Sequence, residues 1–218
     1  MYQLFIKPIS RLLLSLVLLI VLSPIFLIIT LILAIKNRGK VFFVQKRIGL
    51  HEKTFYLIKF KTMLDITDDN GILLPDRQRQ SGFGNILRHF HLDELPQLIN
   101  ILKGDLNFIG PRPLLVEYVP YYNEVQRKRH NVKPGITGLV QVLGGNALNW
   151  DQRLRLDVFY INHQSFAMDS RIFFLTLKYF FKKRMESSED ELFSKDSFIE
   201  YIRSQGSGVR GQVADAKK

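Results

Sequence analysis

The sequence contains no cysteine, and this absence excludes several kinds of protein. Disulfide-linked scaffolds, zinc sites with thiolate ligands and enzymes with a cysteine nucleophile all require that residue. Acidic residues are also few, because 20 Asp and Glu stand against 31 Lys and Arg, which gives a net charge of +11. Such a chain is expected to bind ligands that carry phosphate, such as nucleic acid, anionic lipid or a nucleotide sugar.

One long segment has no charged residue at all. Leu12 to Ile35 is a run of 24 residues interrupted only by Ser, Thr and Pro. A straight helix of this length reaches about 36 Å, and the hydrocarbon core of a bilayer is ~30 Å thick. A cleavable signal peptide is the alternative, but the run is longer than the usual apolar region and no small-residue cleavage site follows it. We therefore expect a membrane segment that is retained.

Ser23 and Pro24 lie in the middle of this run. Pro24 has no N–H for the carbonyl of Ile20 and its ring clashes there, so the helix should kink, while Ser23 can bond back to the preceding turn. The positive-inside rule places both flanks of the run in the cytoplasm. A re-entrant helix-break-helix satisfies that rule, and a kinked spanning helix is the alternative. The flanking basic residues are Lys7, Arg11, Lys36, Arg38, Lys40, Lys46 and Arg47.

The rest of the chain predicts an α+β fold that is mostly helical. Residues 41–45 and 55–63 are rich in β-forming side chains around a Gly49–Lys53 turn, which indicates a small β-hairpin. Apolar periodicity predicts helices over 85–102, 114–129, 150–162 and 171–184. Aromatic residues adjoin basic ones at Tyr118–Tyr122 and along the last helix, which is typical of interfacial amphipathic helices, although core packing explains the same pattern.

Candidate catalytic residues are concentrated at Asp93 and Glu94. Pro96 is tolerated only in the first turn of a helix, so the helix should start near Asp93, with both carboxylates at its positive end and about 100° apart. Asp93 could then attack a phosphorus atom and carry a phosphoryl group, and Glu94 could hold a divalent cation. The alternative is that Asp93 caps the helix and Glu94 complements its dipole.

Basic residues near turns and strand ends favour a phosphate ligand beside these carboxylates. Lys59 and Lys61 alternate along one strand and should share a face. Arg112 stands between Pro111 and Pro113, where the backbone has little freedom, so its guanidinium can be pre-positioned for bidentate phosphate contact.

The sequence resembles the bacterial sugar transferase family, whose small members are monotopic phosphoglycosyl transferases. The resemblance runs in order from the apolar N-terminal run to about Phe181. It rests on the segments Phe42–Gly49, Lys59–Met63, Leu92–Leu98, Lys103–Pro113 and Lys133–Leu139.

The resemblance implies transfer of a sugar 1-phosphate from a UDP-sugar to polyprenol (undecaprenyl) phosphate, with release of UMP. It implies Asp93 as the covalent nucleophile, Glu94 as the ligand of Mg²⁺ and Ser23-Pro24 as the break of a re-entrant helix. Substrate contacts are implied at Lys59, Arg88, Pro111, Arg112, Pro113 and Gln141. The implied location is the cytoplasmic face of the bacterial inner membrane, with membrane lipid and downstream glycosyltransferases as further partners and no nucleic acid.

We accordingly expect a membrane hairpin at 1–36, a catalytic domain at 37–185 and a C-terminal extension at 186–218 that is flexible from about residue 206. Leu143 and Gly145 replace the polar residue and the arginine that the family often has, which weakens inferences about nucleotide contacts and sugar preference. A membrane-tethered nucleic-acid-binding or scaffold protein is the rival interpretation. A nucleic-acid-binding protein would show a basic face with stacking aromatics and no carboxylate pair, and a scaffold would leave both carboxylates dispensable.

Overall fold

The computed structural model describes residues 1–182, which form two compact units. The first, called the dyad unit, comprises Ile9–Gln45 and Tyr56–Gly104. The second, called the Arg112 unit, comprises Met1–Pro8, Lys46–Phe55 and the described residues from Asp105 onward. The predicted α+β class with mostly helical content is confirmed. The predicted division at residues 36 and 185 stays a prediction, and the predicted extension at 186–218 lies outside the described residues.

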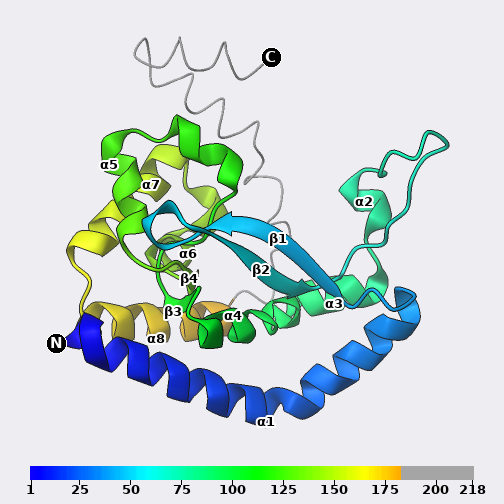
Figure 1. Cartoon of the computed structure of the whole chain (residues 1–218), viewed down its shortest axis with the longest axis horizontal. Coiled ribbons are helices and arrows are strands. Elements are labelled where there is room, and N and C mark those ends of the chain that lie inside the picture. Colours follow the sequence, from blue (N-terminus) through cyan, green and yellow to red (C-terminus); the bar gives the residue numbers. More distant parts are fainter. Residues whose placement is uncertain (183–218) are drawn as a thin grey trace. The chain divides into compact units, whose positions relative to one another are not determined.

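Helix α1 (Lys7–Lys36) contains the apolar run and follows a short π-helical turn at Tyr2–Ile6. It is helical without interruption and bends midway along its length (Figure 1). The hydroxyl of Ser23 donates to the carbonyl of Ile20 at 2.7 Å, which is the acceptor that Pro24 leaves without its usual partner. The predicted kink is therefore present, as a bend within one continuous helix.

The apolar surface of α1 is largely uncovered by protein. Only 11% of its most apolar 18-residue stretch is buried, whereas the core helix of a soluble protein would be mostly buried. Ile29 and Leu33 pack inward, while Ile20 and Ile28 are 64% and 57% exposed. By length, composition and exposure, α1 could span a membrane.

Strands β1 (Phe42–Ile48) and β2 (Thr54–Phe60) pair in a two-stranded sheet, which confirms the predicted hairpin. A 3₁₀ turn at Leu50–Glu52 joins them, closed by a bond from the Gly49 N–H to the Lys53 carbonyl at 2.8 Å. Phe60 at the end of β2 is buried with Ile29 and Leu33 of α1 and with Leu87, and this cluster forms the core of the dyad unit.

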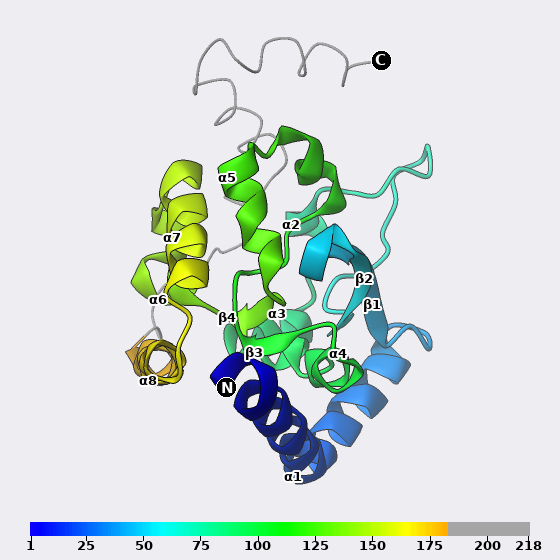
Figure 2. The same cartoon turned by 60° about the vertical axis from the view of Figure 1, so that its left-hand side comes forward.

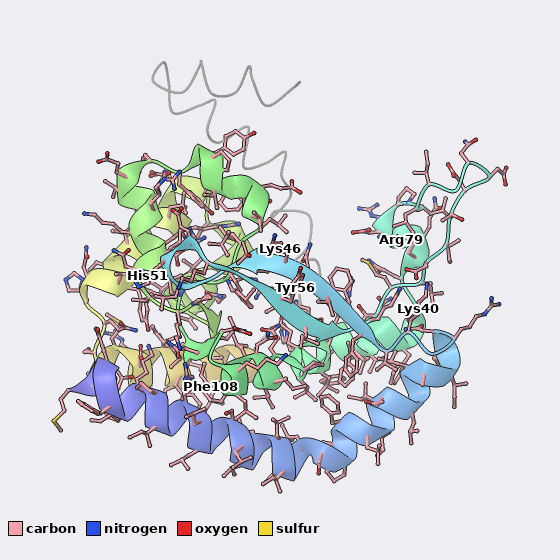
Figure 3. All side chains as sticks on the ribbon, in the orientation of Figure 1. Lys40, Lys46, His51, Tyr56, Arg79 and Phe108 are labelled. Atoms are coloured by element: carbon pink, nitrogen blue, oxygen red, sulfur yellow. The ribbon has the colours of Figure 1, made fainter. Side chains whose placement is uncertain are left out.

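The remaining elements of the dyad unit are short. They are α2 (Asp76–Arg79), α3 (Gly82–His89), a 3₁₀ turn at Leu92–Glu94 and α4 (Gln97–Lys103). Figure 3 labels Arg79 on α2 and Lys40 in the segment between α1 and β1. The prediction of one helix over 85–102 is wrong, because His91 adopts a left-handed conformation (φ 54°) that interrupts the helical hydrogen bonds.

The Arg112 unit is built around a parallel pair of strands, β3 (Asn107–Ile109) and β4 (Gly135–Thr137), with Asn107 opposite Gly135 and Ile109 opposite Thr137. Gly135 is required by close packing, because a Cβ atom there would lie 2.2 Å from the amide nitrogen of Gly110. The helical elements, several of which are visible in Figure 2, are 3₁₀ Val116–Tyr121, α5 (Glu124–Arg127), 3₁₀ Lys128–Asn131, α6 (Leu139–Leu143), 3₁₀ Gly145–Ala147, α7 (Trp150–Asn162) and α8 (Phe166–Lys182).

Sequence periodicity predicted some helices of this unit correctly and others wrongly. The helix predicted at 150–162 is confirmed as α7. The helix predicted at 171–184 is confirmed within the described residues as α8, but it starts earlier, at Phe166. The single helix predicted over 114–129 is wrong, because this segment holds two separate helical elements. A 3₁₀ turn that contains Pro120 ends at Tyr121, and the Asn123 side chain then starts α5 through a capping box with Gln126.

The aromatic segments have different environments. Tyr118, Tyr121 and Tyr122 are at most 8% exposed and pack with Trp150, so their interfacial interpretation is wrong and they belong to the core. Helix α8 buries Ile172 but leaves Phe174 65% exposed, and Phe166, Phe173 and Leu177 are exposed as well. One face of α8 therefore belongs to the core, and another is an exposed apolar surface.

The N-terminal turn is held to α7 and α8 by a buried polar cluster. Lys7 Nζ lies 2.7 Å from Asp169 Oδ2 and donates to the Tyr160 hydroxyl at 2.9 Å. The hydroxyls of Tyr160 and Tyr2 donate to the same carboxylate. Lys7 is one of the basic residues that flank the apolar run, and Asp169 neutralises its charge in the folded chain.

Candidate functional site

Asp93 and Glu94 lie in the 3₁₀ turn that precedes α4. Helix α4 begins at Gln97, after Pro96, so the prediction that it starts near Asp93 is wrong. Pro96 has no N–H, and the backbone before it tightens into a 3₁₀ turn instead of extending the α-helix. Successive residues in a 3₁₀ turn differ by about 120°, so the two carboxylates point in different directions.

Asp93 is a buried residue, at 8% exposed, and its carboxylate has no hydrogen-bond partner among residues 1–182. The capping alternative is therefore wrong for Asp93, because neither the 3₁₀ turn nor α4 is closed by a side-chain cap. Burial raises the pKa of Asp93, and the positive charge of Lys59 opposes this effect most strongly. The Glu94 charge raises this pKa further, while His91 and Arg88 lower it.

Glu94 is paired with a lysine from the hairpin. Its Oε1 atom lies 2.7 Å from Lys59 Nζ, and the two side chains are 14% and 21% exposed. Lys59 precedes Phe60 on β2, and because successive side chains alternate across a strand, burial of Phe60 directs Lys59 to the opposite face. Lys61 does not extend this basic surface: it lies beyond the strand and pairs with Asp65.

Arg88 approaches the carboxylates from α3. Its Nε atom donates to the Thr62 hydroxyl at 2.8 Å, which holds the guanidinium in place. Helix α3 is close to Thr62 because Gly84 has no side chain: a Cβ atom there would lie 2.1 Å from the Thr62 carbonyl oxygen. The hydroxyl of Ser81 caps this helix by accepting from the Gly84 N–H at 3.0 Å.

In the Arg112 unit, the Pro111-Arg112-Pro113 backbone is fixed by three hydrogen bonds. The carbonyl of Pro111 accepts from the Gly135 N–H at 2.9 Å, and the carbonyl of Arg112 accepts from Arg129 Nη2 at 2.9 Å. The carbonyl of Pro113 accepts from Arg47 Nη1 at 3.4 Å. The predicted restriction of this loop is confirmed, and its half-buried arginine extends from a rigid base.

The sequence reasoning missed the buried ion pair behind this loop. Arg129 and Asp157 are 4% and 5% exposed, and their side chains are 2.7 Å apart. Arg129 also donates to the Tyr122 hydroxyl at 3.2 Å. A signal was present, because Asp157 lies three residues after Leu154 and seven after Trp150, on the stripe of α7 that is buried.

A small pocket borders the same loop. His130 lines it, and burial together with the charges of Arg129 and Arg127 lowers the pKa of this histidine to about 3, so its ring is neutral at physiological pH. Its Nε2 atom is buried without a hydrogen-bond partner in the described part of the chain. The other lining residues are Ile48, Pro111, Arg112, Pro113, Arg129, Val132 and Pro134.

Gln141 lies on α6 in the Arg112 unit. Both polar atoms of its amide are buried, and neither has a hydrogen-bond partner among residues 1–182. Unpaired buried amide atoms are unfavourable unless a ligand or water completes them, which fits the predicted substrate contact. Leu143, one of the two departures from the family pattern, is 52% exposed at the end of this helix, and Gly145 starts the next turn.

The structure therefore brings together four of the predicted site residues, Lys59, Arg88, Asp93 and Glu94, within the dyad unit. The other predicted contacts, Pro111, Arg112, Pro113 and Gln141, belong to the Arg112 unit. Ser23 and Pro24 lie within α1.

The carboxylates fit a cation that is shared with a phosphate ligand. Over the described residues, no group of three or more His, Asp or Glu side chains forms a metal site, so a cation on the Asp93-Glu94 pair would keep coordination positions for water or ligand oxygens. Mg²⁺ is commonly held by one or two carboxylates together with substrate phosphates, and Glu94 beside Asp93 matches that donor set.

Comparison with known proteins identifies the family. The family model described as "Bacterial sugar transferase" matches residues 2–183. The chain is 49% identical over 156 residues to "Uncharacterized sugar transferase EpsL" of Bacillus subtilis, covering 72% of this chain and 77% of the relative. It is 32% identical over 182 residues to "Exopolysaccharide production protein ExoY" of Sinorhizobium fredii, covering 76% and 80%.

A longer relative is named by its reaction. The "UDP-glucose:undecaprenyl-phosphate glucose-1-phosphate transferase" of Xanthomonas campestris is 35% identical over 182 residues, which covers 78% of this chain and 37% of the relative. The match to the family model includes the bent helix α1, the Asp93-Glu94 turn and the Pro111-Arg112-Pro113 loop. The chain belongs to the bacterial sugar transferase family.

Proposed function

We propose that this chain is a phosphoglycosyl transferase that moves a sugar 1-phosphate from a UDP-sugar to undecaprenyl phosphate and releases UMP. Relatives named as undecaprenyl-phosphate sugar phosphotransferases support this reaction class. The observation that carries the proposal is the buried residue Asp93, whose carboxylate has no hydrogen-bond partner in the described chain and lies beside Glu94 near Lys59 and Arg88. A structural carboxylate at this depth would normally be paired or hydrogen-bonded.

In the first half-reaction, the Asp93 carboxylate attacks the phosphorus that carries the sugar. A bond forms between this carboxylate and phosphorus, the bond from phosphorus to the bridging oxygen breaks, and UMP leaves with the electron pair. Lys59 and Arg88 provide positive charge for the transferring phosphoryl group. Because no hydrogen bond ties Asp93 to a donor among residues 1–182, its lone pairs are available for the attack.

In the second half-reaction, a phosphate oxygen of undecaprenyl phosphate attacks the same phosphorus. The bond to Asp93 breaks, the free carboxylate is regenerated, and the sugar leaves on a polyprenyl diphosphate. This sequence is ping-pong, with a phosphosugar-aspartyl intermediate between the two substrates. The product carries a lipid-linked sugar, so the reaction class that consumes it is glycosyl transfer by downstream enzymes.

Glu94 is the residue that would hold Mg²⁺ in this account. The metal ion would neutralise charge on the donor's diphosphate when it is bound. Activity should therefore disappear in EDTA and return when Mg²⁺ is added.

The membrane position is also part of the proposal. Helix α1 is proposed to be re-entrant, entering and leaving by the cytoplasmic face of the bacterial inner membrane. Three features support this: its exposed apolar surface, its bend at mid-length and the basic residues on both flanks. The exposed Phe166, Phe173 and Phe174 of α8 fit the headgroup level. This arrangement would place the active site where the phosphate of a polyprenol acceptor lies.

The test uses the full chain in lipid nanodiscs with a panel of UDP-sugars and undecaprenyl phosphate. We expect UMP release with at least one UDP-sugar, and loss of turnover in Asp93→Asn, which keeps the size of the side chain but removes the attacking charge. The contrary outcome is an Asp93→Asn variant that is folded and turns over at the wild-type rate.

A further inference from the structure

We propose that Lys59 acts as a place-holding cation: in the free enzyme its ammonium group occupies Glu94, and it transfers to the donor's diphosphate when a divalent cation takes its place. This inference rests on the proposed function, because it assigns Glu94 as the metal ligand. It adds that metal binding and the Lys59–Glu94 ion pair exclude each other.

The geometry favours competition at Glu94. Lys59 Nζ is 2.7 Å from Glu94 Oε1, so it lies directly against a carboxylate oxygen that a metal ion would use. An ammonium group and a divalent cation that contact the same part-buried carboxylate repel each other, because solvent screens their charges weakly there.

The backbone on both sides of the ion pair is fixed, so the exchange is confined to the lysine side chain. The buried Asn100 of α4 donates from Nδ2 to the carbonyl of Tyr56 at 2.7 Å and accepts from the N–H of Ile58 at 3.0 Å. These bonds join β2 to the helix that follows the Asp93-Glu94 turn. Lysine has a flexible four-carbon stem, and its ammonium can therefore move while strand and turn remain in place.

The exchange also keeps positive charge in the site. When Lys59 leaves Glu94 for the diphosphate, the incoming cation keeps positive charge beside Asp93. A permanently fixed Lys59–Glu94 pair would instead leave the donor's phosphates without this ammonium.

The experiment measures Mn²⁺ binding to the full chain in nanodiscs, without nucleotide, by titration calorimetry or electron paramagnetic resonance. Lys59→Met should bind Mn²⁺ about fivefold more tightly than wild type, because the competing ion pair is gone. The matched control is Lys61→Met, which removes the same charge two positions along the chain but breaks only the pair with Asp65. It should bind Mn²⁺ as wild type does.

Two further variants keep the inference falsifiable if Lys59→Met does not fold. Lys59→Arg should bind Mn²⁺ more weakly than wild type, because a guanidinium pairs with a carboxylate through two hydrogen bonds. Glu94→Gln should lose the binding, which identifies the site being measured.

Unchanged or weaker binding in a folded Lys59→Met, wild-type binding in Lys59→Arg, or Mn²⁺ binding that survives in Glu94→Gln would each overturn the proposal. None of these readouts needs a donor or an acceptor, so they are independent of whether UMP is released.

Discussion

Asp157 Oδ2 accepts hydrogen bonds from both Nε and Nη2 of Arg129, at 3.1 and 2.7 Å. The same Nη2 donates to the carbonyl of Arg112, so the buried ion pair supports the backbone of the Pro111-Arg112-Pro113 loop. Burial makes this pair sensitive to the loss of one member, because the remaining charge would stay in a medium that solvates it poorly.

The first prediction is that Asp157→Leu destabilises the protein by about 3 to 5 kcal/mol, since it leaves the Arg129 guanidinium buried without its counter-ion. Thermal or denaturant unfolding in detergent measures the change. The double variant Arg129→Met/Asp157→Leu should recover much of the loss, because both charges are removed together. Equal destabilisation by the single and double variants would show that the charge balance is not the cause.

The second prediction concerns the titration of Asp93, whose pKa burial raises above the ordinary value of 3.8. The nucleophile must be ionised, so turnover should fall on acidification with a midpoint above 3.8. Lys59→Met should move this midpoint to still higher pH, because Lys59 is the largest charge that favours the carboxylate. Lys61→Met is the control and should keep the wild-type profile. A midpoint that does not move in Lys59→Met would contradict the electrostatic account.

The raised pKa of Asp93 also has a consequence for stability. A group whose folded pKa lies above its unfolded value contributes stability at low pH that is lost as pH rises through the folded pKa. Asp93→Asn should therefore raise Tm at neutral pH, and the gain should shrink as the pH is lowered toward the ordinary value of 3.8. A neutral or destabilising effect at pH 7 would mean that the buried charge is better compensated than its surroundings suggest.

The third prediction tests the topology of α1 in a chain that lacks cysteine. Gln3→Cys and Lys36→Cys place thiols at exposed positions on either side of the apolar run. Both should react with an impermeant maleimide only from the cytoplasmic side. Tyr2 is less suitable for this purpose, because its hydroxyl bonds to Asp169.

Removing the bend provides the control for this labelling. Replacing Ser23 by Ala and Pro24 by Leu removes both the helix-interrupting ring and the compensating hydroxyl, so a straight helix can cross the bilayer. In that background, Gln3→Cys should become reactive from the opposite side. Labelling of the Gln3→Cys thiol from outside without these replacements would show a spanning helix.

Local sequence rules predicted those features that depend on a few adjacent residues. The consequences of Pro24 for α1, the Gly49–Lys53 hairpin and the helix from Trp150 each follow from proline chemistry, turn residues or periodicity. The interruption at His91 was not predictable in this way, because nothing in the residue type requires a left-handed conformation. Tyr118 looked interfacial beside basic residues, but tertiary packing against Trp150 decided its position.

The candidate site was predicted in its residue types but not in its contacts. The sequence reasoning and the family resemblance together identified Asp93, Glu94, Lys59 and Arg88, and the structure places them in one unit. The partner of Lys59 could not be read from spacing, since 35 residues separate it from Glu94. Long-range pairs of this kind depend on how strands and turns pack, which local patterns do not encode.

The most direct test of the central claim is the intact mass of the protein after incubation with a UDP-sugar and Mg²⁺ in the absence of any acceptor. If Asp93 is the covalent nucleophile, the wild-type chain should gain the mass of one sugar phosphate and UMP should appear, whereas Asp93→Asn should gain nothing. Addition of undecaprenyl phosphate should then remove the added mass. UMP that appears only when donor and acceptor are both present, with no added mass on the wild-type chain, would contradict the account.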